Sequence, residues 1–257
     1  MKINVLFSFL IGFVFFKTST MQAQTKQGIV LYEESRVLLT PEKRKQIEEQ
    51  MPDPAIREMV FKRLEGNSKS DMALAFNDVM SCYQAQNVEE KDNDPRVKSM
   101  GSTVGKTFFK NLRSSMYTSQ ENVMGKPFVV EDTLKKINWK LTGDSKQFGK
   151  LNCQKAIATI GKYEVEAWFA MEIPVSSGPA NYWGLPGLII ELKEKNGRTF
   201  TFKEFINEKP NESQMSLPKE GKKVSQKEYD NILAQKTKEL TGGSGTGSGG
   251  VKILKMN

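Results

Sequence analysis

The stretch GPANYWGLPGLIIE, residues 178–191, combines a demanding turn with two aromatic side chains and the beginning of a strand. Pro186 holds its φ at about −65°, and Gly187 accepts the positive φ that a type II turn requires next, so the sequence predicts such a turn here. The apolar run from Leu188 to Leu192 then predicts a strand. In the simplest interpretation, the turn shapes a tight start to this strand and packs Trp183 into the core.

Regular alternation on both sides of this stretch predicts antiparallel strands. After the turn at Gly161-Lys162, every second residue from Tyr163 to Ile173 is apolar. That period of two gives the strand one buried face. Short turns join the successive segments, so we expect a meander and no parallel crossovers. The predicted strands of this half are residues 151–160, 163–173, 188–194 and 199–205.

Trp168 stands on the opposite face of its strand, among the carboxylates of Glu164, Glu166 and Glu172. Because a large indole is seldom left fully exposed, we expect a loop to cover it, and the turn at Tyr182-Trp183 is one candidate. The three glutamates lie at strand spacing on one face. We interpret them as surface charge, since paired catalytic carboxylates would have to flank a substrate.

Two short helices are predicted between about residues 41 and 65. Thr40 and Asp53 have the side chains of helix N-caps, and each is followed by a proline at the first helical position. Met59 and Phe61 belong to the apolar stripe of the second helix. This stripe fits a helix face packed on the sheet. Alternatively, the two helices form a lid over an apolar cavity, with Met59 and Phe61 in its lining.

The pattern as a whole predicts an α+β fold built on a mainly antiparallel sheet, with short helices packed on one face. Its first strand is expected at residues 28–34. Residues 25–241 are long enough for one domain with a substantial core. The Gly/Ser-rich residues 242–257 have the composition of a flexible linker followed by a short tail.

Residues 1–24 have the composition of a secretory signal peptide. Lys2 provides the positive start, an apolar run extends from Val5 to Phe16, and small and polar residues surround Ala23. The run is shorter than the about 20 apolar residues of a transmembrane helix. We therefore expect export to the periplasm or the periphery of the outer membrane of a Gram-negative cell, with no transmembrane segment in the mature chain.

The residue inventory leaves few catalytic arrangements. The chain has no His, which removes Ser-His-Asp and Cys-His arrangements, and two Cys do not provide a zinc cluster of usual spacing. The formal net charge is +8, but acidic residues interleave the basic clusters, and there is no basic, aromatic-rich ribbon for nucleic acid. We therefore expect no enzymatic activity, no metal, no cofactor and no nucleic-acid partner.

Cys82 and Cys153 allow a single intramolecular pairing. An oxidising compartment permits a disulfide between them. Spacing does not reveal connectivity, so two buried free thiols are an equal alternative.

An ordered set of short motifs accompanies the turn. It consists of Trp139, Lys155-Ala156, Ala167-Trp168-Phe169, Ile173-Pro174, Gly178-Pro179 and Gly184-Leu185-Pro186-Gly187-Leu188-Ile189. Together these motifs resemble the GLPGLI family of secreted envelope proteins, and the resemblance extends over residues 117–205. The chain departs from the family pattern at Phe148, where members commonly have Ile, and at residues 162–164, where an Arg and a Tyr are typical.

The resemblance to this family implies a fold more than an activity. It implies a curved antiparallel half-barrel, similar to periplasmic lipoprotein carriers, with helices on the concave side. Family members also often carry a cysteine where Cys153 stands.

Two classes of function remain open. The first is a binding or carrier protein that encloses an apolar small molecule, a lipid or a lipidated molecule. The second is an interaction or assembly accessory of an outer-membrane protein complex, in which the turn from Tyr182 to Gly187 presents rigid aromatics to a partner. The candidate contact residues are Trp168, Tyr182, Trp183, Leu185, Met59 and Phe61.

Overall fold

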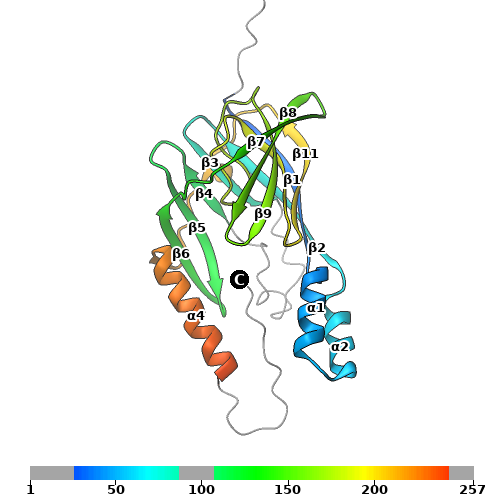
Figure 1. Ribbon diagram of the computed structural model, residues 1–257. Coiled ribbons are helices and arrows are strands. Elements are labelled where there is room, and N and C mark those ends of the chain that lie inside the picture. Colours follow the sequence, from blue (N-terminus) through cyan, green and yellow to red (C-terminus); the bar gives the residue numbers. More distant parts are fainter. Residues whose placement is uncertain (1–25, 87–106, 243–257) are drawn as a thin grey trace, which may run out of the picture.

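The computed structural model describes residues 26–86 and 107–242 (Figure 1). The expected signal peptide and the Gly/Ser-rich tail from residue 243 lie outside the described residues and remain predictions. The described residues form one sheet of twelve strands in the order β12-β6-β5-β4-β3-β2-β1-β11-β10-β9-β8-β7. Neighbouring strands are antiparallel except for β12, which runs parallel to β6. The strands are β1 (Gly28–Val37), β2 (Asn67–Phe76), β3 (Met80–Ala85), β4 (Phe108–Asn111), β5 (Met116–Val123), β6 (Lys126–Thr133), β7 (Lys140–Phe148), β8 (Leu151–Ile160), β9 (Tyr163–Ala170), β10 (Leu188–Glu194), β11 (Arg198–Ile206) and β12 (Lys222–Val224).

The sheet curls strongly round its inner face (Figure 1). Strand β6 is next to one edge in the strand order and β7 forms the other edge, yet only residues 134–139 connect them. An extended chain advances about 3.3–3.6 Å per residue, so this connection spans at most about 25 Å. The two ends of the sheet must therefore approach each other. The prediction of an α+β fold with a curved, mainly antiparallel sheet is confirmed.

The connection between β9 and β10, residues 171–187, crosses the inner face of the sheet, and we call it the plug segment. Its Ser177 hydroxyl lies 2.7 Å from the Ser81 hydroxyl on β3. The buried ammonium of Lys110, on β4, donates to the backbone carbonyls of Gly178, Ala180 and Tyr182 at 2.5, 2.6 and 3.2 Å. The plug segment thus ties the β9–β10 side of the sheet to strands β3 and β4. The turn motif of the sequence therefore lies within a packed part of the molecule.

Gly184, and not Gly187, adopts the left-handed backbone conformation. Gly184 has φ +95°, whereas the φ of Gly187 is not positive, so the predicted type II turn is wrong. Gly187 is required for a different reason, because a Cβ there would lie 2.2 Å from the carbonyl oxygen of Ala170. Only a residue without a side chain allows the two backbone segments to approach so closely.

Helices α1 (Pro41–Gln50) and α2 (Pro54–Leu64) begin where the sequence predicts them. The Thr40 hydroxyl accepts from the Lys43 N–H at 3.3 Å, and the Asp53 carboxylate accepts from the Ala55 N–H at 2.8 Å. The two helices pack on each other through Ile47, Phe61 and Leu64. Figure 1 shows the pair projecting beyond the end of the sheet and not across its inner face. Met59 is 63 % exposed and Phe61 is buried within the pair, so neither residue lines a cavity as the lid interpretation required.

A third α-helix, α4 (Gln226–Gly242), was not expected from the sequence. It follows β12 and packs on β6, where Tyr229 meets the Phe128 ring edge to face at 6.1 Å between ring centroids. A short 3₁₀ turn, η1 (Ser213–Met215), lies beside β3. In the described part of the chain, none of the helices has the length and apolar character that crossing a membrane requires.

Both cysteines are free and buried, which corresponds to the alternative without a disulfide. Cys82 is on β3 and Cys153 is on β8, and five strands separate these two in the sheet. The Cys82 thiol points to the backbone oxygen of Ser216 at 3.8 Å, whereas Cys153 belongs to the main core. A disulfide between Cys82 and Cys153 is therefore not part of this fold.

Candidate functional site

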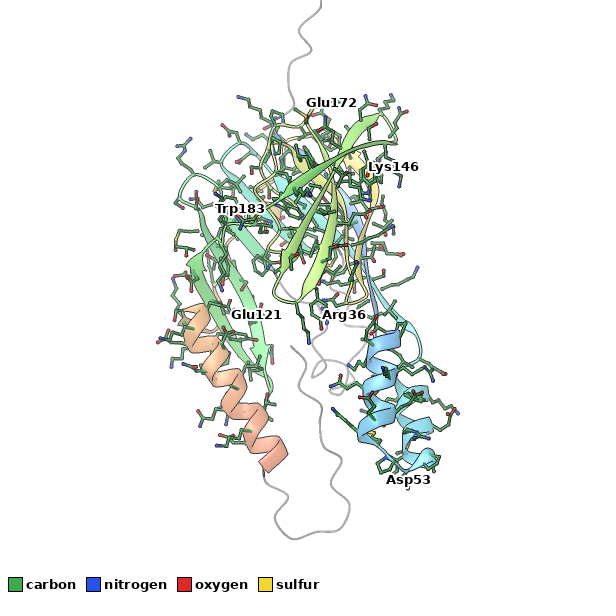
Figure 2. The ribbon with its side chains drawn as sticks, in the orientation of Figure 1. Arg36, Asp53, Glu121, Lys146, Glu172 and Trp183 are labelled. Atoms are coloured by element: carbon green, nitrogen blue, oxygen red, sulfur yellow. The ribbon has the colours of Figure 1, made fainter. Side chains whose placement is uncertain are left out.

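The structure separates the residues that the sequence singled out. Trp168 is half-buried, with Phe148 at 6.0 Å between ring centroids and the Lys146 ammonium 5.8 Å from the indole. Its Nε1–H donates to the Glu166 carboxylate at 3.1 Å. The expectation that the Tyr182-Trp183 turn covers this indole is therefore wrong. Figure 2 shows Trp183 and Lys146 far apart on the sheet.

The residues of the turn motif are mostly part of the core. Tyr182 is 4 % exposed and Leu185 is 2 % exposed. Trp183 is half-buried, and its Nε1–H donates to the carbonyl of Lys135 at 2.9 Å. Its own carbonyl accepts from the Trp139 indole at 2.8 Å. The turn thus holds the connection between β6 and β7 against the plug segment, and it presents little surface to a partner.

A different group of side chains converges where β1, β10 and β11 end near the helix pair. We call it the mouth cluster; Figure 2 marks its position by Arg36. The cluster combines four charged groups with two tyrosines and draws on β1, β3, the plug segment, β10 and β11. Its members are Glu34, Arg36, Tyr83, Tyr182, Glu194 and Arg198.

Arg198 is the centre of the hydrogen bonding in the mouth cluster. Its Nε donates to Glu34 at 2.8 Å, and one of its terminal nitrogens lies 3.6 Å from Oε1 of Glu194. The second carboxylate oxygen of Glu34 accepts from the Tyr83 hydroxyl at 3.0 Å. The Arg198 guanidinium also lies over the Phe200 ring, 4.5 Å from its centroid. These contacts fix both acids around one arginine.

The electrostatics of the cluster distinguish its members. Burial, and then the Glu34 charge, raise the pKa of Tyr83, while burial and the Glu194 charge raise the pKa of Tyr182. Burial opposes the charge of Arg198, but Glu34 and Glu194 outweigh it and raise its pKa. Burial, and then the neighbouring Arg198, lower the pKa of Arg36. At neutral pH the tyrosines are therefore donors and not bases, and Arg36 is the charge that the cluster satisfies least.

Arg36 makes no hydrogen bond or ion pair with any other described residue. It is paired directly opposite Arg198 across the β1–β11 ladder, so the two positive charges face each other. Oε1 of the buried Glu194 carboxylate makes no well-aligned hydrogen bond, and its neighbours are Arg198 at 3.6 Å and the Tyr182 hydroxyl, whose pKa it helps to raise. Arg36 is thus attracted by Glu34 and Glu194 but has no hydrogen-bond acceptor among the described residues.

The sequence contains a local signal for this cluster. Val30, Tyr32 and Glu34 continue one inward-facing alternation along β1, and Arg36 takes the next position. The predicted first strand ends at residue 34, whereas β1 continues to Val37 and so includes Arg36. Glu194 and Arg198 flank the β10–β11 turn, and only the pairing of β1 with β11 brings them to Glu34.

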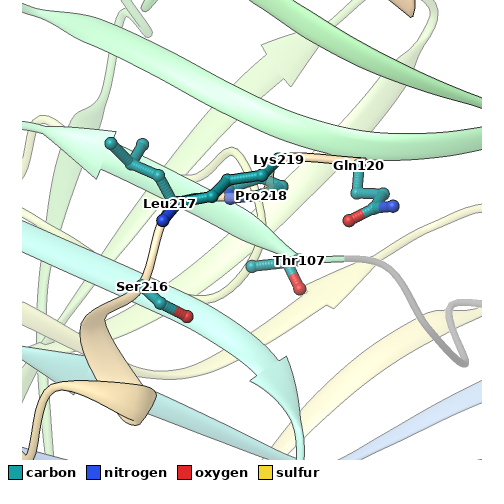
Figure 3. Close-up of a pocket in the computed structure, with 6 residues that line it drawn as sticks. All are labelled: Thr107, Gln120, Ser216, Leu217, Pro218 and Lys219. Atoms are coloured by element: carbon teal, nitrogen blue, oxygen red, sulfur yellow. The ribbon is translucent and has the colours of Figure 1, made fainter. Parts of the chain in front are cut away.

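A hollow lies on another part of the molecule, between β4, β5 and the segment after η1 (Figure 3). It has a volume of about 340 Å³. Its lining mixes polar and apolar groups and includes no residue that the sequence singled out. The lining residues are Thr107, Gln120, Ser216, Leu217, Pro218 and Lys219. Among the described residues, no group of three His, Cys, Asp or Glu side chains is placed to hold a metal ion.

Comparisons with known proteins agree with the fold and leave the activity open. A family described as "Protein of unknown function (Porph_ging)" matches residues 160–191, from the end of β8 to β10. No curated protein matches the chain. Two solved structures of PNGF-II, in space groups P21 and C2, each superpose with a TM-score of 0.54 at 12 % sequence identity. They cover 82 % and 81 % of this chain but 33 % of PNGF-II in each case, so the chain spans about one third of its length. At this identity the likeness concerns the fold alone.

Proposed function

We propose that this chain is a non-enzymatic binding protein of the cell envelope, and that it holds its ligand at the mouth cluster. The observation that carries the proposal is Arg36, a half-buried guanidinium whose N–H donors have no hydrogen-bond acceptor among the described residues, although the charges of Glu34 and Glu194 attract it. Donors that lose water without gaining an acceptor cost stability. Such a group is therefore a candidate for a ligand contact.

Features of the sequence support the cellular setting. The first 24 residues have the composition of a signal peptide, and the motifs around residues 139–189 resemble the GLPGLI family. Both features support a periplasmic or outer-membrane location.

The position of the site differs from the one expected for an apolar carrier. The expected lining residues Met59 and Phe61 lie on the helix pair, away from the inner face, and the plug segment fills that face with Tyr182 and Leu185. The mouth cluster instead offers charged and hydroxyl groups. A polar part of the ligand should therefore make the contacts that fix its orientation.

Native mass spectrometry of the mature protein, purified from an envelope fraction, tests the proposal. We expect a mass excess that disappears on unfolding. Arg36→Ala should lose this excess, whereas Arg113→Ala should keep it, because Arg113 is an exposed arginine on the β4–β5 turn. A wild-type protein without bound mass, or equal bound mass in both variants, would contradict the assignment of the mouth as the ligand site.

A further inference from the structure

The connection from β6 to β7, which joins the two ends of the curled sheet, carries a run of cations without an acid. From residue 133 to residue 143 the sequence has three lysines and neither Asp nor Glu. Lys135, Lys136 and Lys140 are all exposed, and none of them makes an ion pair with another described residue. The connection therefore presents a positive surface.

The acids at the two ends of this run neutralise little of it. Backbone N–H groups of Thr133 and Gln226 are the main causes that lower the pKa of Asp132, and the charge of Lys135 is a minor one. Asp144, at the other end, lies 3.9 Å from the ammonium of Lys155 on β8. The other two lysines of the run are thus left without an acidic partner among the described residues.

Two tryptophans fix the backbone of the connection. The Nε1–H of Trp139 donates to the carbonyl of Trp183 at 2.8 Å, and the Nε1–H of Trp183 donates to the carbonyl of Lys135 at 2.9 Å. Each indole has only this one donor, so both donors are satisfied within the fold. Trp139 is half-buried, and Leu141, two residues later, is 53 % exposed. The side chains at the surface of the connection are therefore apolar ones beside cations.

We call this face the seam surface, and Trp183 marks its position in Figure 2. Its members are Lys135, Lys136, Trp139, Lys140 and Leu141.

The chemistry of the seam surface indicates what would cover it. Indole rings and aliphatic side chains lie at the level of lipid headgroups, and lysines beside them extend their ammonium groups to anionic phosphates. A specific peptide would instead be recognised through directed donors and acceptors. Here the indole donors are used internally, and the lysines are point charges on flexible stems. The surface therefore suits negative charge spread over a plane more than one defined sequence.

We propose that the seam surface docks the mature chain on a membrane that contains anionic phospholipids. Trp139 and Leu141 then lie at headgroup level, and the three lysines reach the lipid phosphates. The chain lies on the membrane and does not span it. This inference goes beyond the proposed function, and none of its residues belongs to the mouth cluster.

Co-sedimentation with vesicles tests the role of charge. We expect the mature chain to bind vesicles of equal parts phosphatidylcholine and phosphatidylglycerol, and to bind vesicles of phosphatidylcholine alone much more weakly. Loss of one lysine should weaken binding by about fivefold, and loss of all three by about a hundredfold. The seam variant is Lys135→Gln/Lys136→Gln/Lys140→Gln.

A matched control separates this surface from general attraction by the basic chain. The control variant is Lys45→Gln/Lys62→Gln/Lys209→Gln, at exposed lysines elsewhere. It changes the net charge by the same amount and should weaken binding only slightly. Equal losses in the two triple variants, or equal binding to the two kinds of vesicle, would overturn the proposal.

Fluorescence tests the apolar contact. The chain has three tryptophans, so Trp168→Phe restricts the emission to Trp139 and Trp183. Phospholipids with brominated acyl chains should quench this emission in anionic vesicles. Leu141→Ser should weaken binding by about fivefold, whereas Leu233→Ser, at a leucine of α4 that is 43 % exposed, should leave it unchanged. Binding without quenching, or equal losses in the two serine variants, would show that another face meets the membrane.

The outcomes also separate this inference from the proposed function. Arg36→Ala should bind the vesicles as the wild type does, because the mouth cluster is not part of the seam surface. Absence of vesicle binding in a protein that keeps its bound mass at the mouth would overturn the membrane inference alone. Vesicle binding that disappears in Arg36→Ala would also contradict it.

Discussion

Lys110 and Arg36 are both cations that folding withdraws from water, and their surroundings differ in one respect. Lys110 donates to three carbonyl oxygens of the plug segment, which is the full donor capacity of an ammonium group. Arg36 carries five N–H donors and has no described acceptor for any of them. The first arrangement satisfies the buried charge within the fold, and the second does not.

The difference shows how a buried charge is to be interpreted in this molecule. Burial alone marks Lys110 even more strongly than Arg36, since Lys110 is fully buried. What separates them is whether the fold supplies partners. A charge that holds two chain segments together is structural, and a charge that the fold leaves unpaired is a candidate for binding.

Replacing Lys110 should have the largest effect on stability. Lys110→Met keeps most of the side-chain volume but leaves the carbonyls of Gly178, Ala180 and Tyr182 without their donor. Because buried acceptors without donors are costly, the free energy of unfolding should fall by about 3–5 kcal/mol. Urea denaturation measures the change. Lys203→Met, at an exposed ion pair with Asp71, is the control and should change little. Equal effects would show that Lys110 does not hold the plug segment.

Arg198 should behave like Lys110 and not like Arg36, although it belongs to the mouth. Arg198→Ala removes the guanidinium that pairs with both buried carboxylates, Glu34 and Glu194. The expected loss is about 3 kcal/mol, measured by the same denaturation experiment. A loss below about 1 kcal/mol would mean that the carboxylates find water or other partners, and the mouth would then be less organised than the structure indicates.

Replacing two glycines of the plug segment by alanine should lower stability by different amounts, and for different physical reasons. Gly187→Ala forces a Cβ to within 2.2 Å of the Ala170 carbonyl oxygen, and backbone on both sides leaves little room to adjust. We expect a loss of about 3 kcal/mol. In Gly184→Ala the new Cβ would lie 3.8 Å from the Trp139 ring, which is an ordinary contact. Only the positive φ then opposes the substitution, and the expected loss is about 1 kcal/mol. Thermal unfolding measures both losses. A larger loss for Gly184→Ala than for Gly187→Ala would contradict the close contact at Gly187.

The titration of Lys110 should make stability depend on pH. Burial lowers the pKa of Lys110 to about 7, from its ordinary value of 10.5. Between these values the unfolded chain keeps the proton that the folded chain has released, so the free energy of unfolding should rise with pH. The rise should be about 1.4 kcal/mol for each pH unit in this window. Denaturation curves at several pH values should show it in the wild type and not in Lys110→Met, and equal slopes would contradict the burial of this amine.

Sequence periodicity was sufficient for the local elements and insufficient for the contacts between them. The N-caps Thr40 and Asp53 and the alternation from Val165 to Phe169 depend on neighbouring residues, and the structure has them as expected. Lys110 follows two phenylalanines in a short strand, and its carbonyl partners lie about 70 residues further along the chain. No local pattern can indicate such a pairing.

The mouth cluster also depends on contacts between segments that are distant in the sequence, although part of its signal is local. Glu34 lies on the buried face of β1 by simple alternation, and an acid at such a position requires a partner. The partner, Arg198, becomes apparent only through the pairing of β1 with β11. Gly187 gives a second example. The sequence indicates correctly that a glycine is needed at this position, but the reason is its close approach to Ala170 on β9 and not a positive φ.

Arg36→Ala should have the smallest effect on stability. Unlike the substitutions above, it should stabilise the protein. The side chain makes no described hydrogen bond, and it faces Arg198 directly across the β1–β11 ladder. Like charges at opposed positions destabilise a sheet. Removing the Arg36 charge should therefore raise the free energy of unfolding by about 0.5 kcal/mol. Lys, which keeps the charge but not the planar donor fork, should leave stability near that of the wild type. A loss of 1 kcal/mol or more in Arg36→Ala would place Arg36 with Lys110 among the structural cations. A gain would instead mean that the fold keeps this arginine at the expense of its own stability, which is what a residue retained for its ligand should do.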